Sequence, residues 1–185
     1  MKLVQRHSPN FGPRSAGAVV SAVVLHGDAS DSAAASADWC CKSKAELRAL
    51  WERTLPARRP ARPWDPVSYH TIVERDGTLY ALVPATKRAW HAGISEIAGV
   101  ADVNDYSVGL CFSNRQDGIE RFTDEQYRVG AAYIASLMRQ FPAITLDRVV
   151  THESCARPPG RKRDPGPLFD LPMFVNIVRR ELARR

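Results

Sequence analysis

Short runs of apolar residues mark the strands that this chain predicts. Val19–Leu25 is almost continuously apolar, which is typical of a buried strand, and it leads directly into His26. Ser107–Phe112 is a second short apolar strand. Arg148–Thr151 is a third, and it presents His152 at its end. The pattern therefore places two histidines at the ends of two buried strands.

Amphipathic stretches predict three helices. Ser43–Arg53 begins with a residue that can cap a helix and has Glu46 three positions later, the spacing of a capping box. Thr123 begins the longest helix, and one stripe of that helix is apolar: Tyr127, Ala131, Ile134, Leu137 and Met138. Phe169–Leu182 forms a closing helix whose arginine-rich end suits the helix dipole.

A hairpin lies between the first two helices. Val67–Glu74 alternates as a strand, Arg75–Thr78 contains the Asp-Gly of a tight turn, and Leu79–Val83 returns as the partner strand. Two stretches, 27–38 and 56–66, are predicted to be a polar loop and a proline-rich surface connection. Strands and helices are interleaved, so we expect the α/β class: one domain over residues 1–185 with a central mixed sheet flanked by helices.

The composition of the chain limits which binding partners and which cellular compartment we expect. No apolar run approaches the ~20 residues of a membrane span, and the start of the chain lacks the apolar core of a secretory signal, so we expect no membrane partner and a cytoplasmic location. Four cysteines, two of them adjacent, do not form a disulfide framework. The net charge of +6 favours an anionic partner, which both nucleic acid and bacterial cell wall satisfy. The sequence has no zinc finger or phosphate-binding loop that would support nucleic acid as the partner. Nothing indicates an interface, so we expect a monomer.

Two histidines and one aspartate are the candidate metal ligands. His26 and His152 each end a predicted strand, and Asp164 follows His152 by twelve residues. Strand ends at one face of an α/β sheet are where sites are built. Three protein ligands are what a catalytic zinc keeps, because its fourth position then holds water. The alternative is that the histidines are structural and that Asp164 lies by chance in a surface loop rich in proline, glycine and arginine.

Five segments, taken in order, carry a family resemblance. They are Val24-Leu25-His26, Ser68-Tyr69-His70 with Arg75-Asp76-Gly77, Ala89-Trp90-His91-Ala92-Gly93, Asn104-Asp105-Tyr106-Ser107-Val108-Gly109, and Gly160-Arg161-Lys162-Arg163-Asp164-Pro165-Gly166. Together they resemble the zinc-dependent N-acetylmuramoyl-L-alanine amidases, a group that includes cytoplasmic anhydro-muropeptide amidases, phage lysozyme-amidases and peptidoglycan recognition proteins. The resemblance runs from about Ser8 to Phe169.

The resemblance implies a reaction and a set of residues. The reaction is hydrolysis of the amide between N-acetylmuramic acid and the first L-alanine of the peptidoglycan stem peptide. The family's zinc ligands fall on His26, His152 and Asp164. Lys162 matches a family lysine suited to stabilising an oxyanion, and Tyr69 matches a tyrosine that orients or protonates the reacting groups. The substrate would be peptidoglycan or a soluble muropeptide.

Four further residues are candidates for binding that substrate. His91 and Asn104 resemble polar residues of the substrate groove, and the Trp90 ring suits stacking on a sugar face. Arg157, like Arg161, suits the stem-peptide carboxylates because a guanidinium matches carboxylate geometry. The alternatives are a packed aromatic ring at Trp90 and solvated arginines on a basic surface.

Cys111 departs from one branch of the family. The cytoplasmic anhydro-muropeptide enzymes carry a glutamate general base at this position, whereas the phage branch lacks it. A cysteine supplies no equivalent proton shuttle without a strongly perturbed pKa. We therefore interpret Cys111 as a small buried residue, with Tyr69 carrying more of the chemistry. A non-catalytic muropeptide-binding module remains the second hypothesis, and the biological role remains open between wall recycling and lysis as an endolysin.

Overall fold

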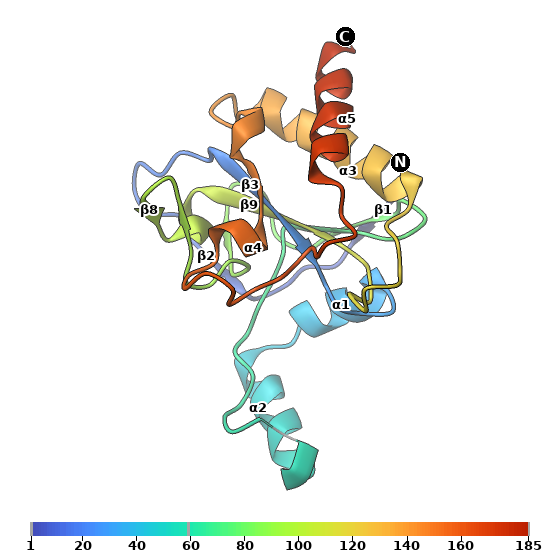
Figure 1. The fold of residues 1–185 in the computed structure, drawn as a ribbon. Helices are drawn as coiled ribbons and strands as arrows, with labels where there is room; N and C mark the ends of the chain where they lie inside the picture. Colours follow the sequence, from blue (N-terminus) through green and yellow to red (C-terminus); the bar gives the residue numbers. More distant parts are fainter. Residues whose placement is uncertain (1, 59, 185) are drawn as a thin grey trace.

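A six-stranded mixed sheet forms the centre of the computed structural model, which describes residues 2–58 and 60–184 (Figure 1). Its strand order is β1-β5-β4-β9-β3-β10; β4 and β5 are antiparallel, and the other neighbours are parallel. The six strands are β1 (Leu3–Gln5), β3 (Ala22–Gly27), β4 (Thr71–Val73), β5 (Leu79–Ala81), β9 (Ser107–Phe112) and β10 (Val149–Thr151).

Helices cover the sheet, and two small ribbons lie beside it. The helices are α1 (Ala33–Cys40), α2 (Lys44–Arg53), α3 (Asp124–Gln140), α4 (His152–Cys155) and α5 (Leu171–Ala183), with 3-10 turns at Pro56–Arg58, Val103–Asp105 and Leu146–Arg148. The ribbons pair β2 (Phe11–Gly12) with β6 (Arg88–Ala89) and β7 (Glu96–Ile97) with β8 (Val100–Ala101). The predicted fold class, a mixed sheet flanked by helices, is confirmed.

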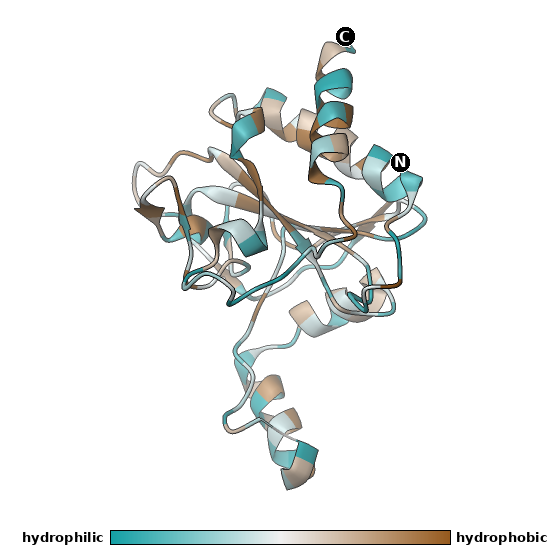
Figure 2. Ribbon diagram, in the orientation of Figure 1, coloured by the Kyte–Doolittle hydropathy of each residue, from teal (hydrophilic) through white to brown (hydrophobic). Residues whose placement is uncertain are grey.

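Alternation along the strands gives the sheet two different faces. Val23 and Leu25 of β3 point to one face, where they join the main core beneath α3 and α5. Val24 and His26 point to the other face, which α1 and the loops around Ala92 cover. Figure 2 shows the hydrophobic residues concentrated in these central strands. The period-2 geometry of a strand thus sends His26 to the α1 face and leaves the α3/α5 face to apolar packing.

Several predicted elements are confirmed at their ends. The expected capping box forms at Ser43 of α2, and Thr123, the expected start of the longest helix, forms a second capping box with Gln126. The Asp-Gly turn is also present: Gly77 has φ of +79°, and Thr78 donates its backbone N–H to the Asp76 carboxylate at 2.8 Å. A positive φ is the conformation that glycine adopts at little cost, so this turn depends on Gly77.

The predicted loop over 27–38 is wrong in its second half, because α1 begins at Ala33. Ser32 caps this helix by accepting the backbone N–H of Ala35 at 3.2 Å. Ala33, Ala37 and Cys40 recur at helical spacing and are buried against the sheet. Small residues at those positions let the helix lie close to β4 and β5.

Helix α2 projects away from the sheet together with the segment that follows it (Figure 1). Leu47 is its one buried residue, and Leu55 just beyond it is 66% exposed. Among the described residues, no helix has the length and apolar character needed to cross a membrane.

Candidate metal centre and active site

Strand register brings His26 and His152 together. β10 pairs with β3 in parallel, and Thr151 lies opposite Leu25. The residue that follows Leu25 and the residue that follows Thr151 are both histidines, so the two imidazoles lie side by side, with ring centroids 4.5 Å apart. The Thr151 hydroxyl accepts the backbone N–H of Ser154 and starts α4, which fixes the turn that carries His152.

A long loop returns the third residue, Asp164, to the same place. The backbone N–H of Glu153 donates to the Asp164 carbonyl at 3.0 Å, which joins the loop to the first turn of α4. Arg161 holds the middle of the loop by donating to the carbonyls of Ala92 and Ile94 at 2.9 and 2.6 Å. Asp164 is therefore positioned by a backbone hydrogen bond of its own and by the side-chain contacts of Arg161 earlier in the loop.

The three side chains converge on one point. Asp164 Oδ2 lies 3.0 Å from Nδ1 of His26 and 3.0 Å from Nδ1 of His152. One ligand atom from each residue lies within 4.8 Å of the others. Both histidines are buried, at 0% and 3% exposed. We call these residues the His-His-Asp cluster.

A chain of hydrogen bonds behind His26 determines which of its nitrogens carries the proton. Ser107 donates its hydroxyl to the Val103 carbonyl at 2.6 Å, so its oxygen is free to accept Nε2–H of His91 at 3.3 Å. Burial lowers the pKa of His91 well below its usual value, and this neutral ring then accepts at Nδ1. Nε2 of His26 lies 3.1 Å from that nitrogen and donates to it. Nδ1 of His26 is left with a lone pair.

His152 also carries its proton on Nε2, for a simpler reason. Its Nε2 lies 3.1 Å from the Ala92 carbonyl, which can only accept a hydrogen bond. Nε2 therefore carries the proton, and Nδ1 presents a lone pair to Asp164. Metal-bound histidines commonly donate their second ring N–H in this way.

The cluster fits a metal cation. Two imidazole lone pairs and a carboxylate oxygen face one another at about 3 Å, and a shared proton or a cation is needed to make that arrangement favourable. Burial lowers the pKa of His26 to about 4, although a hydrogen bond that the protonated ring would donate to Asp164 opposes this shift, so the ring is neutral at neutral pH. Burial raises the pKa of Asp164, but the two adjacent imidazoles outweigh it and hold the pKa below its usual value. Two nitrogens and one oxygen are ligands that zinc accepts.

A cavity of about 630 Å³ opens in front of the cluster, and we call it the central cavity. Tyr69 and Lys162 line it together with His152 and Asp164, so the structure brings both candidate catalytic residues to the cavity in front of the cluster. The Tyr69 and His26 rings have centroids 5.0 Å apart. Burial raises the pKa of Tyr69 well above its usual value. Its hydroxyl therefore stays protonated at neutral pH.

Cys111 is buried beside the cluster. In the parallel pairing of β3 with β9, Cys111 lies opposite His26. Burial raises the pKa of its thiol well above the usual value, while a hydrogen bond with Tyr69 has a smaller opposing effect. A neutral, buried thiol matches its expected role as a small packing residue.

The four candidate substrate-binding residues take different positions. His91 lines the central cavity and also supports His26 from behind. Asn104 is buried, and its side-chain carbonyl accepts the backbone N–H groups of His91 and Ala92 at 3.1 and 2.8 Å. Trp90 is 36% exposed, and Arg157 lies 3.8 Å from Glu96; neither lines the central cavity.

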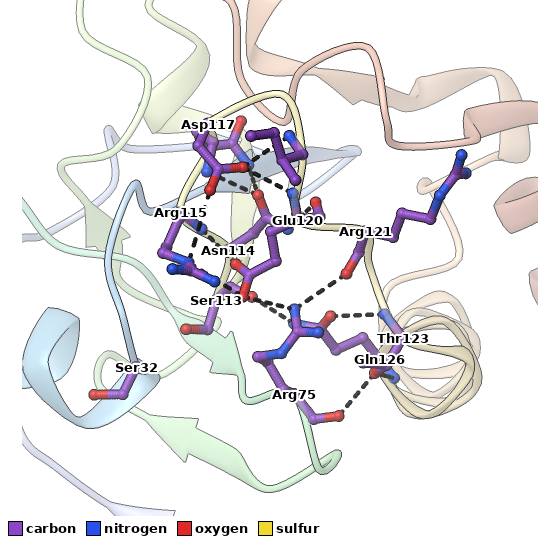
Figure 3. A network of polar contacts seen from close by, with 12 residues as sticks. Ser32, Arg75, Ser113, Asn114, Arg115, Asp117, Glu120, Arg121, Thr123 and Gln126 are labelled. Carbon is purple, nitrogen blue, oxygen red and sulfur yellow. Dashed lines mark hydrogen bonds and ion pairs between the residues drawn. The ribbon is translucent and has the colours of Figure 1, made fainter.

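The loop after β9 forms part of the rim of the central cavity, which the sequence analysis did not predict. Asn114, Gln116 and Asp117 line the central cavity there. Figure 3 shows the network that supports this loop: Asp117 accepts the backbone N–H of Glu120 at 2.8 Å, and Arg115 donates its backbone N–H to the Glu120 carboxylate at 2.7 Å. In a sequence, the spacing of nearby polar residues is the only signal of such a rim.

Asp28, two residues after His26, was also missed. One of its oxygens accepts the backbone N–H of Asn114 at 2.9 Å and that of Ser30 at 3.2 Å, and the other accepts the Ser36 hydroxyl at 2.6 Å. Burial raises its pKa to about 6. Asp28 thus joins β3, α1 and the rim at the edge of the central cavity.

Comparison with known proteins identifies the family. Residues 16–167 match the profile of the N-acetylmuramoyl-L-alanine amidases, a stretch that contains the whole His-His-Asp cluster. This chain belongs to the N-acetylmuramoyl-L-alanine amidase family. A curated relative, the 1,6-anhydro-N-acetylmuramyl-L-alanine amidase AmpD of Salmonella typhimurium (strain SL1344), is 41% identical over 114 residues. That alignment covers 60% of this chain and 57% of the relative, so the chain spans little more than half the length of the curated amidase it matches.

Solved structures of amidases share the fold. A selenomethionine derivative of AmpD superposes with a TM-score of 0.72 and 30% identity, covering 96% of this chain and 93% of that one. The Escherichia coli amidase AmiD, solved with the substrate anhydro-N-acetylmuramic acid-L-Ala-D-γ-Glu-L-Lys, superposes with a TM-score of 0.62 and 25% identity. Coverage there is 89% of this chain and 60% of AmiD.

Proposed function

We propose that this protein is a zinc-dependent hydrolase of the amide between N-acetylmuramic acid and L-alanine in peptidoglycan fragments. The observation that carries the proposal is the convergence of the buried His26 with His152 and Asp164, which line the central cavity, in a chain of the amidase family. The hydrogen-bond chain through His91 and the Ala92 carbonyl holds both imidazoles in the tautomer that a metal needs.

Each residue has a role that its position supports. His26, His152 and Asp164 would hold the zinc, which when bound acts as a Lewis acid on the scissile carbonyl and lowers the pKa of water. Tyr69, a protonated phenol beside His26, donates a hydrogen bond to the reacting oxygen or to the departing amine. The Lys162 ammonium lines the same cavity and stabilises negative charge that develops on the carbonyl oxygen.

Digestion of a soluble N-acetylmuramoyl-L-alanyl peptide by the zinc-loaded protein, followed by mass spectrometry, tests the reaction. We expect free peptide that begins with L-alanine, and no such product from an Asp164→Ala variant. Tight binding of the intact muropeptide without cleavage would instead show a recognition module. Intact sacculi as a second substrate separate the two biological roles, because a recycling enzyme prefers the soluble fragment and an endolysin the polymer.

A further inference from the structure

A second pocket adjoins the central cavity beneath α1. Its volume is about 440 Å³, and we call it the α1 pocket. Asp28, Val67 and Tyr69 line both spaces, so the two meet beside the His-His-Asp cluster. A substrate whose scissile bond lies at the cluster therefore extends in two directions from it.

The lining of the α1 pocket has the composition of a sugar site. The Trp39 indole and the Tyr69 ring supply aromatic surface, and Ser30 and Ser36 supply hydroxyl groups. Among the described residues that line it, none is lysine, arginine or histidine. An apolar wall with a few fixed polar groups suits a neutral, hydroxyl-bearing ring better than an anionic peptide.

Asp28 is prepared to accept a hydroxyl group in this pocket. Its carboxylate already accepts three hydrogen bonds, from Ser30, Ser36 and Asn114. A carboxylate offers about four lone-pair sites, so one more donor can be accommodated. The same contacts fix the carboxylate in place, which limits the entropy lost when a ligand binds.

Trp39 is also held in position. Its ring meets the Trp64 ring edge-on, with centroids 5.5 Å apart and an interplanar angle of 87°. Trp64 belongs to the segment that follows α2, so the projecting part of the chain supports this wall of the pocket. A rigid aromatic side chain contributes contact area with little loss of rotamer freedom.

The central cavity differs from the α1 pocket because cationic side chains line it in addition to acidic ones such as Asp117. Lys162 and Arg163 line it, and neither reaches the α1 pocket. Cationic side chains suit the carboxylates of a stem peptide. Because only the central cavity offers cationic side chains, it is the more favourable of the two spaces for the stem peptide.

We propose that the α1 pocket, built on Trp39 and Asp28, binds the muramic acid sugar while the central cavity takes the stem peptide. This inference rests on the proposed amidase function and adds the direction in which the substrate lies. It makes Trp39 a determinant of specificity for the sugar.

Two substrates with the same stem peptide test the assignment, one carrying N-acetylmuramic acid and one carrying only its D-lactoyl group. We expect the zinc-loaded protein to cleave the muramoyl substrate with a kcat/KM roughly 10-fold or more above that of the lactoyl substrate, the size of effect that loss of pocket contacts gives. Trp39→Ala should bring this ratio close to one.

A second variant keeps the test independent of folding. Ala35→Gln places a larger side chain into the α1 pocket from an exposed position of α1 and should lower the same ratio. Ala34→Gln, at a neighbouring helix position outside the pocket lining, is the matched control and should keep the wild-type ratio.

The outcomes separate the two proposals. A wild-type ratio near one, or a ratio that Trp39→Ala and Ala35→Gln both leave unchanged, would overturn the sugar assignment while the amidase function stands. Failure of the wild-type protein to cleave either substrate would overturn the amidase function, and the sugar assignment with it.

Discussion

Replacing His91 with leucine removes the acceptor on which the proton of His26 depends. Nε2 of His26 donates to Nδ1 of His91 across 3.1 Å in a fully buried position. Without that acceptor, a buried N–H is left unsatisfied, at a cost of about 1–3 kcal/mol. His26 can recover a partner by moving its proton to Nδ1, but that removes the lone pair a metal needs. Because 1.4 kcal/mol is a factor of ten, we expect a loss of roughly 10- to 100-fold in zinc affinity.

The assay is competition for zinc against a chromophoric chelator at neutral pH, with no substrate present. That readout separates the positioning of His26 from any role of His91 in binding substrate. His91→Asn is the matched variant, because its amide oxygen can occupy nearly the position of the lost Nδ1, and we expect it to retain most of the affinity. If His91→Leu binds zinc as tightly as the wild type, the hydrogen bond from His26 to His91 does not control how well His26 binds the metal.

Three further changes test other parts of the account. Tyr69→Phe removes the hydroxyl beside the cluster and should lower kcat by at least ~10²-fold, measured on the soluble muropeptide. Gly109→Ala places a Cβ 2.6 Å from Cγ of His91, so it should destabilise the fold by about 1–3 kcal/mol in urea unfolding and also weaken zinc binding. Burial lowers the pKa of His70 from 6.5 to about 3, so below pH 6.5 the unfolded chain binds a proton that the folded chain does not. The free energy of unfolding of the chelated protein should therefore fall as the pH drops through this range, and less steeply in His70→Asn.

For each of these three variants, one outcome would contradict the expected effect. Tyr80→Phe is the control for Tyr69, since Tyr80 packs against the same apolar cluster outside the central cavity, and equal losses in both variants would indicate packing rather than chemistry. Wild-type stability in Gly109→Ala would mean that His91 is free to move. An identical pH dependence in His70→Asn would assign the effect to other buried groups.

The central strands were predictable from runs of apolar residues, and the ligand triad was predictable from the order of the motifs along the chain. Continuous apolar residues at 19–25 and 107–112 marked two neighbouring strands of the sheet, although β3 begins only at Ala22. The start of the longest helix was expected at Thr123, which is the residue that caps α3. The His-His-Asp cluster followed from histidines at strand ends together with the family motif around Asp164.

What the sequence did not reveal depends on contacts between distant segments. α1 was hidden because alanine and serine residues at 32–37 look like a loop, and only their helical spacing reveals a buried face. The link from His26 through His91 to Ser107 depends on register and on the close approach that Gly109 permits. Asn104 was expected in the substrate groove, and the sequence did not reveal that its side-chain oxygen accepts the backbone N–H groups of His91 and Ala92.

Zinc reconstitution of the chelated protein tests the central claim most directly. Hydrolysis of the muramoyl-L-alanine bond would be followed as zinc is added back in known molar ratio, with Asp164→Ala alongside. We expect no hydrolysis without metal, a plateau at one zinc per chain, and no recovery in the variant. Full hydrolysis by the chelated protein, or full recovery in Asp164→Ala, would contradict that claim.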